Sequence, residues 1–99
     1  MRTERDGSKV TMLAEGRIDT NNAPLFASEI EEALKGATEF ILDFSDLEYI
    51  SSSGLRVIML AVKTMRRQGN MRIVNASEDI YELLEATRFT GICDIEMKE

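Results

Sequence analysis

The sequence predicts an α/β domain with a mixed, mostly parallel sheet of four to five strands, packed with three to four helices. Short apolar runs of strand length alternate with longer segments whose apolar residues recur at three- and four-residue spacing, which indicates helices. Two short strand-like runs at the start flank the turn dipeptide Asp6-Gly7 and indicate a hairpin. Because strands that alternate with helices join through right-handed crossovers, the later strands are expected to be parallel.

The first third of the chain is expected to form the hairpin and one helix. Residues 3–5 and 9–15 would be its strands, since apolar residues alternate along the second segment. Turn- and cap-forming residues at 20–22 precede Pro24, which suits the first turn of a helix. Gly36 would end that helix. Its buried stripe would consist of Phe26, Ile30, Ala33 and Leu34.

The rest of the chain repeats the alternation of strands and helices. Residues 40–44 are an almost unbroken apolar run, typical of a strand buried on both faces. An amphipathic helix is expected over 55–65, a strand over 71–74 and a third helix over 80–87. Residues 94–97 are expected to add a short strand at the edge of the sheet.

Composition limits the possible partners and compartments. A chain of 99 residues with 43% hydrophobic and 30% charged residues is expected to be one folded domain over residues 1–99. Its net charge of −6 argues against nucleic acid or an anionic membrane surface as a partner. The single Cys93 cannot form an internal disulfide, and no apolar stretch reaches spanning length. We therefore expect a cytoplasmic protein, either a monomer or a weak homodimer.

The absence of histidine removes several classes of enzyme. A Ser-His-Asp triad and histidine-containing metal sites cannot be built, and one cysteine cannot supply a zinc cluster. The glycines are scattered singly and form no phosphate-binding loop, so neither a cofactor nor a metal is expected. Asp19, Asp43 and Asp46 could in principle pair for acid-base chemistry. Acidic residues at strand ends and turns more commonly serve as caps.

Three serines and a glycine, Ser51 to Gly54, stand where the central apolar run gives way to the second helix. The first N–H groups of a helix lack intrahelical partners, so a serine there can cap them. A phosphate added to such a serine would meet free donors and the positive end of the helix dipole. In parallel sheets, functional sites lie at the carboxyl ends of strands. Residues 43–54, expected to be the loop from the central strand into this helix, are therefore the candidate site.

The chain also resembles STAS domains, and among them the small bacterial anti-sigma factor antagonists. The stretches that carry the resemblance are Gly16-Arg17-Ile18-Asp19, Asn22-Ala23-Pro24-Leu25, Ile41-Leu42-Asp43-Phe44-Ser45 and Tyr49-Ile50-Ser51-Ser52-Ser53-Gly54-Leu55. Together they cover nearly all of the chain, in the order and spacing of that family. The resemblance implies a single STAS domain that acts as a protein partner switch and not as an enzyme.

In such a switch, the unphosphorylated antagonist binds an anti-sigma factor serine kinase and frees a sigma factor. The kinase phosphorylates a serine at the start of the second helix, and a cognate phosphatase restores binding. Ser52 matches the phosphorylated serine, while Ser51 stands where the family usually has an aspartate. The partner-binding residues expected around Ser52 are Ser51, Ser53, Gly54, Asp19, Asp43 and Arg56.

Other interpretations of these residues stay open. The serines could simply cap the helix, Asp43 could cap a turn, and Asp19 could serve the first helix. A STAS scaffold or transport accessory module could use the same surface without phosphorylation. A small enzyme could use Ser52 with Asp43 or Lys63, although the lack of histidine argues against it. A deep apolar pocket beside Ser52 would favour that enzyme.

Overall fold

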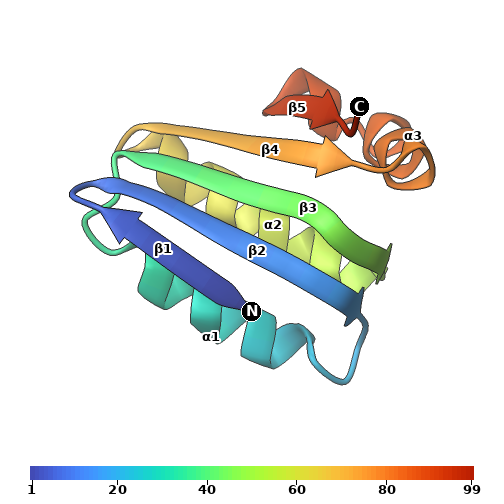
Figure 1. The fold of residues 1–99 in the computed structure, drawn as a ribbon, viewed down its shortest axis with the longest axis horizontal. Helices are drawn as coiled ribbons and strands as arrows, with labels where there is room; N and C mark the ends of the chain where they lie inside the picture. The colour runs from blue at the N-terminus through green and yellow to red at the C-terminus, as the bar shows by residue number, and fades with distance from the viewer.

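The computed structural model describes residues 1–99, and its centre is a five-stranded sheet whose strand order follows the sequence (Figure 1). The strands are β1 (Arg2–Asp6), β2 (Lys9–Ile18), β3 (Glu39–Ile50), β4 (Asn70–Ala76) and β5 (Asp94–Met97). β1 and β2 form the antiparallel hairpin, and β2, β3, β4 and β5 pair in parallel, each with the next. The predicted mixed, mostly parallel sheet is therefore confirmed.

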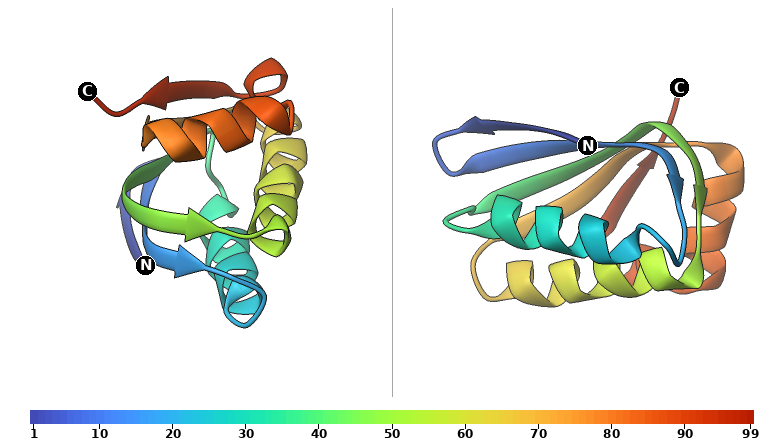
Figure 2. Two further views of the ribbon diagram at one scale, coloured as in Figure 1. Left: turned by 90° about the vertical axis from the view of Figure 1, so that its right-hand side faces the viewer. Right: turned by 90° about the horizontal axis from the view of Figure 1, so that it is seen from below.

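Helices cover one face of the sheet. They are α1 (Ala23–Leu34), α2 (Ser52–Arg66), α3 (Glu78–Ala86) and the short 3₁₀ helix η1 (Phe89–Gly91). α1 and α2 lie side by side under β1 to β4, whereas α3 lies near β5 at the far edge of the sheet (Figure 2). None of the helices combines the length and apolar character needed to cross a membrane.

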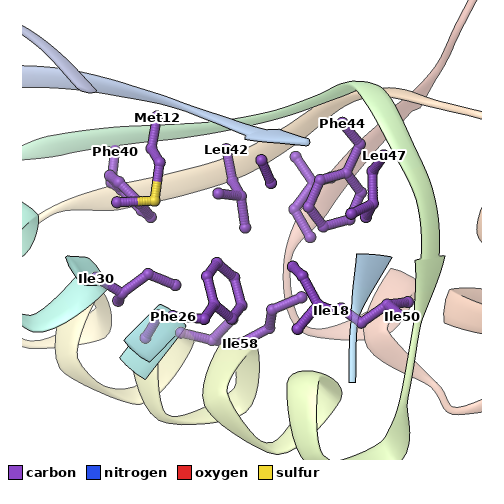
Figure 3. Close-up of a cluster of buried hydrophobic side chains, with 14 of the residues drawn as sticks. Met12, Ile18, Phe26, Ile30, Phe40, Leu42, Phe44, Leu47, Ile50 and Ile58 are labelled. Atoms are coloured by element: carbon purple, nitrogen blue, oxygen red, sulfur yellow. The ribbon is translucent and has the colours of Figure 1, made fainter. Parts of the chain in front are cut away.

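The core lies between the sheet and the two long helices. Along β2, Val10, Met12 and Ala14 are fully buried, because alternate residues of a strand face the same side. They pack with the buried stripe of α1 and with the apolar side of α2 (Figure 3). No polar or charged residue is buried in this core. Ile18 and Ile50 close the core at the end where α2 begins.

The strand β3 is longer than the sequence predicted, and the expected loop over residues 43–54 is wrong. β3 continues from the apolar run as far as Ile50, because Phe44, Leu47 and Ile50 still face the core. The end of β2 supplies its partner, with Gly16 opposite Leu47 and two register shifts that bend the pair. Only Ser51 separates the strand from the helix. The two elements are thus joined almost directly.

Candidate functional site

The candidate site is formed where β2 and β3 end and α2 begins. The Ser51 backbone N–H donates to the Ile18 carbonyl oxygen at 2.8 Å and so fixes the residue before α2 against the end of β2. Ser51 has an extended backbone, and its Oγ accepts from the Gly54 N–H at 3.3 Å. This is the geometry of an N-cap residue. Ser51 therefore supplies the side-chain cap of α2.

Ser52 is the first residue of α2 and is exposed. Ser51 supplies the cap, and the Ser52 hydroxyl has no hydrogen-bond partner within the chain. The N–H groups of Ser52 and Ser53 lie in the first turn, where no intrahelical acceptor exists. The structure thus presents a free hydroxyl at a hydrogen-bonded helix start, next to backbone donors that suit an anion.

Gly54 is buried and allows the start of α2 to approach the two strand ends. A Cβ atom at this position would lie 2.7 Å from Ile18 Cγ2 and 2.7 Å from Ile50 Cγ1. Real Cβ atoms do not approach carbon atoms so closely, so any larger residue would push the helix or the isoleucines apart. Gly54 therefore positions the serines and presents no side chain to a partner.

Asp19 orders the turn from β2 into α1. Its Oδ1 atom accepts from the N–H groups of Asn21 and Asn22, at 3.0 and 3.1 Å. In return, the Asp19 N–H donates to Asn22 Oδ1 at 2.8 Å, and Asn22 Nδ2 donates to the Arg17 carbonyl oxygen at 2.7 Å. Since Ile18, the residue before Asp19, is bonded to Ser51, this turn lies beside the serines. The Asp19 carboxylate therefore forms its hydrogen bonds within this turn.

Asp43 lies on the sheet and away from the serines. It pairs with Leu13 of β2 and Val74 of β4, and Ile50 is about 20 Å further along the strand. Its Oδ1 atom accepts from the Ser45 N–H at 2.9 Å and from Asn75 Nδ2 at 3.0 Å. Burial acts to raise the pKa of Asp43, but these hydrogen bonds outweigh it and lower the pKa below its ordinary value.

The structure adds two residues to which the sequence gave no role. Arg17 and Tyr49 face each other at the ends of β2 and β3, and the Arg17 guanidinium carbon lies 4.4 Å from the Tyr49 ring centre. This is a cation–π contact. Both side chains are exposed. Tyr49 lies three residues before Ser52, and Arg17 precedes Ile18, whose carbonyl oxygen accepts from the Ser51 N–H. The sequence contains both residues but does not reveal their pairing, which depends on the bends in β2.

Arg56 is exposed one turn after Ser52 and forms no ion pair. It borders a hollow of about 250 Å³ between α1 and α2, which also reaches Ser53. That hollow lies on the surface and does not enclose the Ser52 hydroxyl. The geometry of the site suits contact with another macromolecule more than the enclosure of a small substrate.

Proteins of one family resemble this chain over nearly its whole length. The STAS domain model matches residues 1–99. BtrV of Bordetella bronchiseptica, which is described as an anti-sigma factor antagonist, is 33% identical to this chain over 89 residues. The match covers 88% of this chain and 76% of BtrV.

Solved structures share the fold. The crystal structure of a Thermotoga maritima protein described as an anti-sigma factor antagonist superposes on this chain with a TM-score of 0.88 at 24% sequence identity. The match covers 96% of this chain and 84% of that one. SpoIIAA of Bacillus in its phosphorylated form has a TM-score of 0.75 at 16% identity, over 95% and 88% of the two chains. Both likenesses extend across the sheet and its helices.

Proposed function

Because the chain belongs to the STAS domain family, we propose that it is an anti-sigma factor antagonist whose partner is an anti-sigma factor kinase. The unphosphorylated protein binds this kinase through the start of α2 and so releases a sigma factor for transcription in the cytoplasm. Phosphorylation of Ser52 ends the binding, and a cognate phosphatase restores it. The named antagonist BtrV and the phosphorylated form of SpoIIAA support the proposal.

The observation that carries the proposal is that Ser51, and not Ser52, caps α2. Ser51 makes the cap, while Ser52 is exposed and its hydroxyl is free. A phosphoryl group adds a charge of about −1.5 to −2 at neutral pH and three acceptor oxygens. At Ser52 these would meet the first N–H groups and the positive end of the helix dipole. The fold therefore tolerates the modification.

The effect of phosphorylation falls on the partner. A bulky dianion in a docking surface has to be desolvated and repels any acidic group opposite it. If phosphorylation costs a few kcal/mol of binding free energy, the affinity falls about a hundredfold. Arg17, Tyr49 and Arg56, exposed around Ser52, are residue types that often anchor protein interfaces. No rearrangement of the domain is needed.

The test compares Ser52→Asp and Ser52→Ala with the wild type by calorimetric titration against the purified kinase. Ser52→Asp should lose binding by about tenfold or more, because it places a negative charge at the contact. Ser52→Ala should bind as the wild type does. With kinase and ATP, intact mass should rise by one phosphate in the wild type and stay unchanged in Ser52→Ala. Ser28→Asp, on the exposed surface of α1, is the matched control for added charge.

Equal affinity of Ser52→Asp and Ser52→Ala would contradict the switch. If the kinase also transferred no phosphate, the remaining interpretation would be a STAS module that binds its partner constitutively. The serine at position 51, where the family usually has aspartate, is the feature that keeps this second candidate open.

A further inference from the structure

An apolar groove runs along the helix layer between α1 and α2. It consists of two hollows, of about 260 and about 250 Å³, which share Ala27, Val57 and Leu60 and therefore form one depression. The facing residues are small, with Ala27 on α1 and Ala61 on α2, so the two helices leave space between them. We call this depression the α1–α2 groove.

The length of the α1–α2 groove suits a short helix. On α2 it extends from Ser53 to Thr64, about three turns or about 16 Å at the helical rise. Its lining is apolar over the middle of that length, with Val57 half-buried and Leu60 58% exposed. Grooves of this kind receive the apolar face of an amphipathic helix.

The two ends of the α1–α2 groove carry opposite charges. Arg56 lies at the end near Ser53, and Glu31 lines the other end. Neither side chain forms an ion pair within the chain. A helix with a carboxylate at one end and a cation at the other would satisfy both while its apolar face covers Leu60.

We propose that the α1–α2 groove binds an amphipathic helix of the anti-sigma factor, with an acidic residue at Arg56 and a basic residue at Glu31. This inference rests on the proposed function and extends its contact surface from the serines along the helix layer. The position of Arg56 also links binding in the groove to phosphorylation of Ser52. Arg56 lies four residues after Ser52, on the same side of α2, so a phosphate on Ser52 competes with the partner's carboxylate for the guanidinium.

The test uses two leucines of nearly equal exposure. Leu60, 58% exposed, lines the groove, whereas Leu25, 62% exposed, lies outside it on α1. Leu60→Gln and Leu25→Gln both remove apolar surface without adding charge, and glutamine is a good helix former. In titrations against the purified anti-sigma factor kinase, Leu60→Gln should weaken binding about tenfold or more. Leu25→Gln should bind as the wild type does, and circular dichroism should show both variants folded.

Three other outcomes would overturn the inference. If both leucine variants bind normally while Ser52→Asp loses binding, the groove is not part of the interface and the proposed function stands. If Leu60→Gln changes only self-association, measured by sedimentation, the groove is an interface between two copies of the chain. If the wild type binds no anti-sigma factor, the groove proposal and the proposed function both fail.

Discussion

Replacing Gly54 with alanine tests whether the close approach of α2 to the strand ends positions Ser52. The added Cβ would lie 2.7 Å from both Ile18 Cγ2 and Ile50 Cγ1, and 3.1 Å from Ile50 Cδ1. Both isoleucines are buried, and their branched side chains are stiff, so they cannot turn away easily. The carbon atoms would have to separate by about 1 Å to reach an ordinary contact.

The expected cost of Gly54→Ala follows from two opposing effects. Overpacking of a filled core costs about 1–3 kcal/mol. Alanine is a better helix former than glycine, which returns about 1 kcal/mol. The net loss is therefore up to about 2 kcal/mol, and a loss of that full size would lower the Tm of a domain of this length by roughly 8–16 °C. Because the start of α2 would also shift, affinity for the proposed kinase partner should fall.

Gly91→Ala is the matched control for this substitution, since a Cβ at Gly91 would meet no atom within 4 Å. Thermal unfolding followed by circular dichroism should leave the control within about 0.5 kcal/mol of the wild type, as for ordinary surface changes. Titration with the kinase reports the second effect. The reasoning is refuted if Gly54→Ala is as stable as Gly91→Ala and binds the kinase normally.

Two further predictions concern side chains with hydrogen bonds that the structure defines. Ser51→Ala should lower the free energy of unfolding by about 1 kcal/mol through loss of the helix cap, and Ser51→Asp should restore it; equal stability of all three in urea unfolding would contradict the cap. Because the folded pKa of Asp43 is lowered, its carboxylate stabilises the fold above the unfolded pKa of about 4, and this stabilisation is lost as pH falls through the folded pKa. The Asp43→Asn variant should therefore lose less stability than the wild type between about pH 5 and pH 2, and parallel acid-unfolding curves would contradict this.

Local sequence patterns were sufficient to predict most of the elements. The apolar spacing in α1 and α2 and the alternation in β2 are set by residues a few positions apart, and the structure confirms each of them. The length of β3 was not predictable in this way. Its second half pairs with the bent end of β2, where Leu47 lies opposite Gly16, and such pairing depends on residues about 30 positions away.

The same difference between local patterns and contacts of distant segments decides which features of the site could be predicted. The sequence predicts the helix start at the serines and capping as one role for them, because capping is local. It also predicts Asp43 in a loop near the serines, whereas the extension of β3 places Asp43 in mid-sheet beside Asn75. The Arg17–Tyr49 contact and the α1–α2 groove were not predicted, since both depend on the register and packing of separate elements.

The three consecutive serines have different surroundings, and this difference matters for the proposed switch. Ser51 is bonded to the helix that it caps, Ser52 is exposed with a free hydroxyl, and Ser53 is half-buried at the end of the α1–α2 groove. A negative charge at Ser51 would mainly stabilise the helix start, because aspartate caps as well as serine does. At Ser52, which is exposed, the same charge would project into solvent, where the proposed partner would meet it, without disturbing the cap. The structure therefore allows modification at one of these serines to alter binding while its neighbour preserves the fold.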